Sequence, residues 1–300
     1  MLALTWSTAC ALHANHLLAK RRTARTLAWY AEELAIFTTW YAPADALPDA
    51  AAIERFLAAQ HAAGRKPSTV HARFRALRAV FLFLERRRYV TAEANPIRLL
   101  DAPAVPQVAR RHVTLPDVER LQAACAAGTW LDARDRLLVG LLFYSGLRVA
   151  ELCALTVQDV DTTNLTVLVR SGKGEKARLV PFPAAVATLL VRYLYLRPVH
   201  AEHLFLAATG QHNVKGPLTR DGVRQILVRR CRQAGIAPAY NPHAFRHGFA
   251  MWLLNAGARL TTVATAMGHA DSQITAQIYA HTTVATVRRE YDEALARLHR

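Results

Sequence analysis

Several residues in the last third of this 300-residue chain have the types and spacing needed to hold a phosphate group and attack it. His243 and Arg246 lie three residues apart, His269 follows a glycine, and Tyr279 comes ten residues later. Arginine suits phosphate because its planar guanidinium binds two oxygens at once and stays charged. A histidine can assist proton transfer, and a tyrosine becomes a nucleophile when nearby cations favour its phenolate. This stretch therefore predicts phosphodiester chemistry.

Two segments far upstream add further candidates. Arg148 follows a helix break that we expect at Gly146, and Glu151 lies three residues further on, where it can hold Arg148 by a salt bridge. An ordinary ion pair on a helix surface fits that pattern equally well. Lys173 lies between two glycines, so its side chain can reach a minor groove or an active site. A solvated lysine in a turn is the simpler interpretation of that residue taken alone.

The charge of the chain indicates a nucleic-acid partner. Thirty-eight Lys and Arg residues against 22 Asp and Glu give a formal charge of +16 and a sequence pI near 10.4. Such a surface releases counterions when it binds the phosphate backbone, although ribosome association or an unrelated basic surface would produce the same charge. The sequence has no apolar run of about 18 residues, which excludes a membrane span. We expect no signal peptide, and a cytoplasmic, nucleoid-associated location.

The cysteines are scattered and form no CxxC pair. This spacing predicts buried free thiols in a reducing compartment. The residues concerned are Cys10, Cys125, Cys153 and Cys231.

Amphipathic periodicity predicts an all-helical region over residues 1–100. The first helix covers residues 1–20, Thr23 caps the second, Asp49 caps the third, and the fourth begins near Ser68. One face of that fourth helix is apolar and consists of Val70, Phe74, Leu77, Phe81 and Leu84.

The basic residues of this region are predicted to contact DNA. Those of the fourth helix fall largely outside its apolar stripe, where a solvated helix face is the alternative interpretation. The predicted DNA-binding residues are Lys20, Arg21, Arg22, Arg65, Lys66, His71, Arg73, Arg75 and Arg78.

Residues 101–111 contain two prolines and small side chains, so we expect a linker there and a second domain over residues 112–300. In that domain Thr114 and Asp117 predict a capping box, and a long apolar helix ends at Gly146. Two strands flank the Gly-Lys-Gly turn as a β-hairpin. Further helices are expected at residues 184–196, at 219–234 and from His243. The predicted fold is mainly α with one small antiparallel sheet, an α+β catalytic domain behind a helical domain.

The order and spacing of these motifs resemble the tyrosine recombinase (phage integrase) family over about residues 114–281. The helical region before them fits that family's N-terminal core-binding domain, and the layout is most similar to the Xer-type and integron-type enzymes. Phe245 stands where the family commonly has Leu, and the gap from His269 to Tyr279 is one residue longer than in Xer proteins. The resemblance implies two domains that form a C-shaped clamp on DNA.

The resemblance also implies a site-specific recombinase that needs no metal, cofactor or ATP. In that family's chemistry two arginines clamp the scissile phosphate, two histidines hydrogen-bond its oxygens, a lysine protonates the leaving 5′-oxygen, and a tyrosine forms a 3′-phosphotyrosyl bond. The matching positions are Arg148, Arg246, His243, His269, Lys173 and Tyr279, with Glu151 as a supporting residue.

The implied partner is double-stranded DNA with an inverted-repeat core site, bound by a tetramer on two duplexes. The C-terminal helix would dock on the neighbouring protomer, although packing on its own domain is the simpler interpretation of its apolar repeat. That repeat consists of Val284, Val287, Tyr291, Leu295 and Leu298. Whether a second recombinase or accessory proteins take part stays open.

Other functions remain as alternatives to recombination. A non-catalytic architectural DNA-binding protein would also be basic and helical, and a type IB topoisomerase would share the chemistry. A metal-dependent nuclease is less compatible, because the histidines near the site alternate with arginines that repel a divalent cation.

Overall fold

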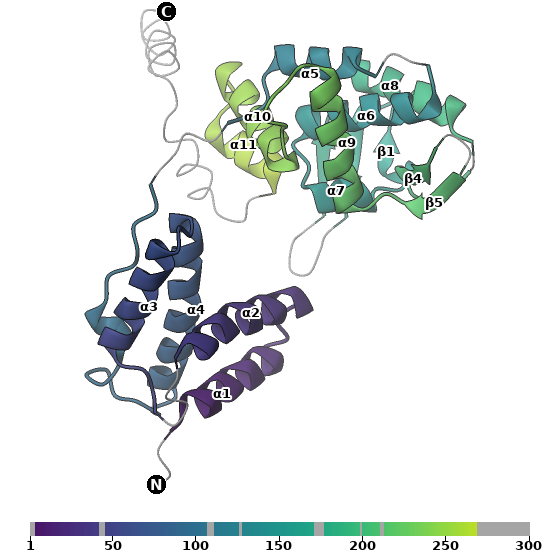
Figure 1. Ribbon diagram of the computed structural model, residues 1–300. Helices are drawn as coiled ribbons and strands as arrows, with labels where there is room; N and C mark the ends of the chain where they lie inside the picture. The colour runs from purple at the N-terminus through teal and green to yellow at the C-terminus, as the bar shows by residue number, and fades with distance from the viewer. Residues whose placement is uncertain are drawn as a thin grey trace, which may run out of the picture. The chain divides into compact units, whose positions relative to one another are not determined.

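The computed structural model describes residues 4–41, 46–106, 111–125, 128–170, 177–198, 200–210 and 213–268. The chain folds into two compact units, Met1–Ala109 and Arg110–Arg300. Figure 1 colours the first unit purple to blue and the second teal to yellow. The division between them falls inside the segment where the sequence predicts a linker.

The first unit is helical, and α4 packs against α1, α2 and α3. Its core contains four large aromatic side chains that are at most 1% exposed: Trp6, Phe37, Phe56 and Phe81. The elements are α1 (Trp6–Ala19), α2 (Ala24–Trp40), α3 (Ala50–Ala62), α4 (Pro67–Arg86) and a short 3-10 helix, η1 (Pro96–Leu99).

The predicted N-caps of α2 and α3 are confirmed. The Thr23 hydroxyl accepts a hydrogen bond from the Thr26 backbone N–H, and an Asp49 carboxylate oxygen accepts one from Ala52. Each satisfies a backbone donor that has no partner within its own helix.

The predicted start of α4 near Ser68 is confirmed to within one residue. The helix begins at Pro67 with Lys66 at the N-cap, and Ser68 lies inside the first turn. Proline suits the first helical position because that residue's N–H would have no intrahelical partner. The apolar face is confirmed, since Val70, Phe74, Leu77, Phe81 and Leu84 are all buried.

The expectation that Arg73 faces outward is wrong. Its side chain is buried, lies 3.6 Å from the Glu33 carboxylate and donates a hydrogen bond to the Gln60 side-chain oxygen. These partners belong to α2 and α3, so Arg73 ties three helices together. Loss of one partner would leave a buried charge uncompensated, and the buried guanidinium is not available to DNA.

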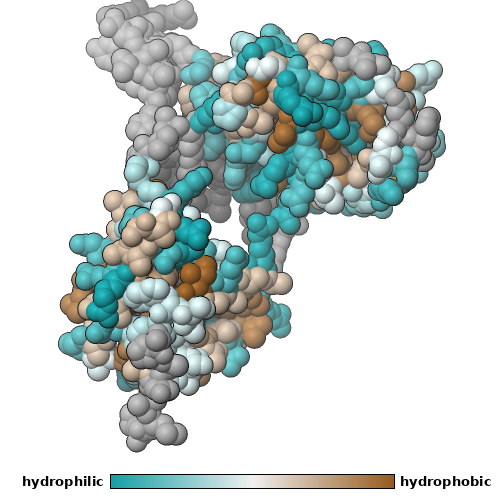
Figure 2. All heavy atoms as spheres, in the orientation of Figure 1, coloured by the Kyte–Doolittle hydropathy of each residue, from teal (hydrophilic) through white to brown (hydrophobic). Residues whose placement is uncertain are grey.

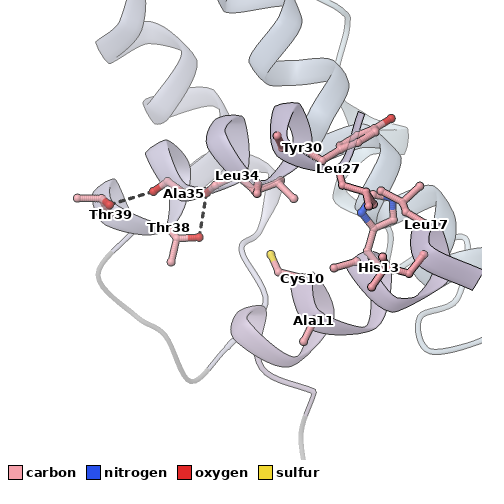
Figure 3. Close-up of a pocket in the computed structure, with 14 residues that line it drawn as sticks. Cys10, Ala11, His13, Leu17, Leu27, Tyr30, Leu34, Ala35, Thr38 and Thr39 are labelled. Atoms are coloured by element: carbon pink, nitrogen blue, oxygen red, sulfur yellow. Dashed lines mark hydrogen bonds between the residues drawn. The ribbon is translucent and has the colours of Figure 1, made fainter. Parts of the chain in front are cut away.

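A pocket of about 670 Å³ lies between α1 and α2, where His13, Leu17 and Tyr30 line it (Figure 3). His13 is buried beside the rings of Tyr30 and Phe83. Burial, and secondarily the charge of His16, lowers the pKa of His13 to about 4. His13 is therefore neutral at pH 7 and resists protonation in the folded state.

This lowered pKa predicts acid destabilisation of the chain. An unfolded histidine titrates near pH ~6.5, so the stabilisation is complete above that pH and is lost as the pH falls through the folded value of about 4. We expect His13 to contribute about 2–3 kcal/mol to the loss of unfolding free energy between pH ~7 and pH ~4.5. Denaturant unfolding of the full chain and of His13→Leu at both pH values measures it. Equal pH dependence in the two proteins would contradict this assignment.

The second unit is built around α6 (Trp130–Ser145), a buried helix that packs against α5 (Leu115–Ala123), α8 (Ala184–Leu196) and α10 (Pro242–Asn255). The predicted capping box of α5 is confirmed, because Thr114 and Asp117 exchange side-chain to backbone hydrogen bonds. The other helices among the described residues of this unit are α7 (Val149–Ala154), the 3-10 helix η2 (Val157–Asp159), α9 (Arg220–Gln233) and α11 (Leu260–Met267).

The predicted hairpin is confirmed within a three-stranded antiparallel sheet. Strand β2 (Thr166–Val169) pairs with β3 (Arg178–Pro181) on one side and with β1 (Val160–Asp161) on the other. The expectation of a single sheet is incomplete, because β4 (Leu206–Thr209) and β5 (Asn213–Pro217) form a second antiparallel pair.

The close approach of α10 to α6 depends on Gly248. A Cβ atom there would lie 2.3 Å from the Val113 carbonyl oxygen and 3.1 Å from the Phe143 ring. The absence of a side chain lets the N-terminal part of α10, which carries His243 and Arg246, pack directly on the core.

All four cysteines are free thiols, two of them buried and two half-buried. Burial raises the pKa of each thiol, so all are protonated at neutral pH. Among the described residues, no helix is both long and apolar enough to cross a membrane. Hydrophilic residues cover much of the face of the second unit seen in Figure 2.

Candidate active site

The junction between α6 and α7 presents the first arginine of the site. Gly146 ends α6 in the left-handed region at φ 59°, and Arg148 is the N-cap of α7. Glu151 accepts 2.8 Å hydrogen bonds from the Arg148 backbone N–H and from its Nη1 atom. The predicted salt bridge is confirmed, and it fixes the guanidinium at the start of the helix.

The C-terminal end of α11 brings distant cations together. Three successive carbonyl oxygens each accept a hydrogen bond from a different arginine. The Ala266 oxygen accepts from Arg178 Nε at 3.1 Å, and the Gly268 oxygen accepts from Arg148 Nη2 at 3.0 Å. The Met267 oxygen between them accepts from Arg246 Nη2. Carbonyls at a helix C-terminus lack intrahelical donors and carry partial negative charge, which favours guanidinium groups there.

Arg246 reaches this cluster from α10 and is buried, at 4% exposure. Its Nη1 atom donates a 2.6 Å hydrogen bond to the Gly146 carbonyl oxygen, two residues before Arg148. The same guanidinium thus joins the end of α6 to the end of α11. This places the functional groups of Arg148 and Arg246, about a hundred residues apart in sequence, on one small surface.

His243 lies in the first turn of α10, which Asn241 caps by accepting the Ala244 backbone N–H. The imidazole of His243 is exposed, and the half-buried His247 ring lies one turn further, with 6.2 Å between the ring centroids. The structure therefore carries His243 and Arg246 on the same short N-terminal segment of α10, as the sequence predicts.

Arg178 is a member of the cluster that the sequence analysis did not identify. Its Nη1 and Nη2 atoms lie 3.1 and 2.9 Å from the two carboxylate oxygens of Glu151. Burial alone would raise the pKa of the Glu151 carboxyl, but hydrogen bonds from Arg178 and Arg148 outweigh it and hold that pKa below its usual range. Glu151 is therefore a carboxylate shared by two arginines.

Several predicted site residues fall outside the part of the chain that the structure describes. They are Lys173, His269, Tyr279 and the apolar repeat from Val284 to Leu298. No group of three His, Cys, Asp or Glu side chains able to hold a metal occurs within the described ranges.

The basic residues of the first unit are mostly exposed. His71 is half-buried, with its Nδ1 atom 2.9 Å from the Pro103 carbonyl oxygen, and Arg73 is the buried exception. The exposed set is Lys20, Arg21, Arg22, Arg65, Lys66, Arg75 and Arg78.

The described part of the site suits an anionic ligand that presents several oxygen atoms, such as a phosphate group, better than a hydrophobic one. Arg148 is 33% exposed on its side chain, so its guanidinium both contacts the protein and reaches solvent. Guanidinium groups bind phosphate oxygens in pairs and stabilise negative charge that develops during phosphoryl transfer. The residue directly after Gly268 is His269, so the arginine cluster adjoins the next predicted catalytic residue in sequence.

Comparison with known proteins supports this chemistry. Residues 111–286 match the phage integrase family. The chain is 30% identical to the tyrosine recombinase XerD of Listeria monocytogenes over 283 residues, covering 90% of this chain and 92% of that protein. It is 34% identical to the tyrosine recombinase XerD of Ralstonia nicotianae over 265 residues, covering 85% and 83%.

The fold also matches a solved structure. The Tn1549 transposon integrase in complex with circular intermediate DNA superposes with a TM-score of 0.74 at 21% identity, covering 96% of this chain and 99% of that one. The family match spans more than half of the chain and includes the segments that carry Arg148, Glu151 and Arg246. The chain belongs to the tyrosine recombinase (phage integrase) family.

Proposed function

We propose that this protein is a site-specific recombinase that cleaves and rejoins DNA through a 3′-phosphotyrosyl intermediate, without metal or ATP. The observation that carries the proposal is the meeting of Arg148 and Arg246 at the end of α11, directly before His269. Two arginines from separate helices, fixed against the same carbonyl cluster, suit a single scissile phosphate better than a stretch of DNA backbone. A purely architectural DNA-binding protein has no need of this arrangement.

The reaction follows from the side chains and their proposed roles. Arg148 and Arg246 bind the non-bridging oxygens, and His243 and His269 hydrogen-bond to the same phosphate. His243 accepts the proton of the Tyr279 hydroxyl as the phenolate oxygen forms a bond to phosphorus. The bond from phosphorus to the 5′-oxygen breaks, and Lys173 gives that oxygen a proton. Attack by a 5′-hydroxyl from another strand reverses the step. The phosphotyrosyl bond preserves the energy of the phosphodiester, so no external energy source is needed.

DNA binding is assigned to both units. The exposed basic residues of the first unit, together with the half-buried His71, would contact phosphates and grooves, and Arg73 is removed from the predicted set because it is buried. Phosphate contacts of this kind set orientation and make affinity depend on salt. The fold match to an integrase solved in complex with DNA supports DNA as the partner. A clamp around an inverted-repeat core site is proposed from the family resemblance.

The assembly is proposed to be a tetramer on two duplexes, with the C-terminal helix of one protomer docked on the next. The apolar repeat from Val284 to Leu298 supports this exchange. Such docking would make the position of each tyrosine depend on a neighbour. The working location is the cytoplasm, at the nucleoid, where the DNA partner lies.

Covalent capture tests the proposed function. Nicked duplexes with two randomised inverted-repeat arms are incubated with the full chain in EDTA, and adducts that survive denaturing electrophoresis are sequenced to give the site. Peptide mass spectrometry is expected to place the DNA on Tyr279. The control variant Tyr279→Phe is expected to bind the selected duplex and to form no adduct.

The other outcomes separate the alternatives. Binding without any adduct on any selected duplex would sink the recombinase proposal in favour of an architectural protein. An adduct that forms without sequence preference, together with relaxation of supercoiled plasmid, would indicate a topoisomerase. Cleavage that EDTA abolishes would indicate a metal-dependent nuclease.

A further inference from the structure

Arg178 connects three elements of the second unit. It lies at the start of β3, where its register partner on β2 is Val169. Its guanidinium contacts both oxygens of Glu151 on α7 and the Ala266 carbonyl oxygen on α11. The strand, the helix with the first arginine of the site and the helix before His269 are therefore fixed to one another through a single side chain.

The two arginines that share Glu151 differ in exposure. The Arg178 side chain is 13% exposed, whereas that of Arg148 is 33% exposed. Glu151 itself is 11% exposed, so its negative charge is poorly solvated and requires cationic partners. Among these three described side chains, two positive charges face one negative charge, and Arg148 is the more exposed of the two arginines.

Gly268 shows that the guanidinium of Arg178 occupies a defined place. The glycine has φ 64°, and a Cβ atom there would lie 2.8 Å from the Arg178 Cζ and Nη1 atoms. Any side chain at position 268 would displace the guanidinium. Two physical constraints thus favour glycine at position 268: the left-handed backbone and the Arg178 guanidinium packed against it.

We propose that Arg178 is a positioning residue for cleavage, which acts through Arg148 and the end of α11 without touching DNA. By neutralising Glu151 it prevents this carboxylate from competing with the scissile phosphate for the Arg148 guanidinium. By holding Ala266 it keeps the segment that leads to His269 against the arginine cluster. This inference rests on the proposed recombinase function.

The variant Arg178→Met tests the role. In single-turnover cleavage of the captured duplex, we expect adduct formation to fall about 10²-fold with unchanged DNA affinity, because a small misplacement of a positioned group has an effect of this size. The rate of adduct formation by Arg178→Lys is expected to lie between those of Arg178→Met and the wild type. The lysine ammonium keeps the charge but cannot make the paired contacts of a planar guanidinium. Arg197→Met is the matched control, because Arg197 also donates to carbonyl oxygens, those of Ala201 and Leu204, but not to Glu151.

A neutral substrate distinguishes positioning from loss of structure. A methylphosphonate at the scissile position lacks one charged oxygen and depends less on Arg148. If Arg178 acts through Arg148, the deficit of Arg178→Met relative to wild type shrinks to less than about 10-fold on this substrate. An equal deficit on both substrates would show general disruption and overturn the proposal.

A second variant tests the charge argument directly. Removing the carboxylate by Glu151→Gln in the Arg178→Met background is expected to restore at least about 10-fold of the lost cleavage rate, because the competing charge is gone. No recovery, or wild-type cleavage by Arg178→Met alone, would overturn the proposal. Failure of the wild-type chain to form any adduct would instead contradict the proposed function.

Discussion

Replacement of Arg246 by lysine is expected to lower the rate of covalent adduct formation by about 10²–10³-fold, the typical effect of removing one preorganised donor from a charge-stabilising site. Arg246 uses separate nitrogens to bind the Gly146 and Met267 carbonyl oxygens, and a lysine has one nitrogen on a flexible stem. The variant keeps the positive charge, so DNA affinity is expected to stay within a few-fold of wild type. Single-turnover cleavage and a binding isotherm on the captured duplex measure the two effects.

The matched control for this substitution is Arg134→Lys. Arg134 is also buried, at 3% exposure, and donates to the Leu206 carbonyl oxygen and to Asp135, away from the α11 cluster. This variant measures how much stability and cleavage rate are lost when lysine replaces a buried arginine elsewhere in the same unit. If Arg134→Lys slowed cleavage as much as Arg246→Lys, the effect would come from stability and not from the phosphate site.

Alanine in place of Gly146 is expected to destabilise the second unit by about 2–5 kcal/mol. The left-handed backbone costs a residue with a side chain about 1–2 kcal/mol. A Cβ atom would also lie 2.2 Å from the Phe249 ring, and overpacking of a core adds about 1–3 kcal/mol. Relief of this clash by a shift of the backbone would also move the Gly146 carbonyl oxygen that Arg246 binds. Denaturant unfolding of the full chain measures the loss, analysed as separate transitions if the two units unfold independently.

Two further variants divide this effect into its parts. Gly235→Ala introduces the same residue at φ 67° with no atom within 4 Å of the new Cβ, so it isolates the backbone term. Phe249→Leu combined with Gly146→Ala relieves the ring contact and is expected to recover part of the stability. Equal losses for the two glycine variants would show that Phe249 plays no part.

Local features of the fold were predictable because their causes lie within a few residues. The Thr23, Asp49 and Thr114 caps follow from side-chain oxygens that satisfy backbone donors three residues on. Gly146 marks a helix end because few other residues tolerate its backbone angles. The strands beside the Gly-Lys-Gly turn follow from β-branched alternation. The short β4 and β5 strands carry too few alternating apolar residues for the same pattern to be recognised.

The misplaced and missed residues depend on partners that are distant in sequence. Arg73 lies beside the apolar stripe of α4, and only the positions of Glu33 on α2 and Gln60 on α3 make it a buried residue. The motif pattern indicated Arg148, Glu151 and Arg246 by family spacing. The indication for Arg178 was weaker. It lies two residues before Val180, so both side chains point to the same face of β3, and Val180 is buried. A charged side chain on a buried face usually needs a partner.

The arginine cluster at the end of α11 also has a charge that matches one stage of the proposed reaction better than another. Three guanidinium groups and the ionised Glu151 leave two positive charges in the described part of the site. A phosphodiester in DNA carries one negative charge, whereas the pentacoordinate species formed when a phenolate adds to it carries two. The cluster is thus electrically complementary to the species being formed and over-charged for intact DNA. Interactions that are stronger in the transition state than in the ground state accelerate the chemical step. Here the preference for the more negative species comes from the number of arginines that share the single carboxylate of Glu151.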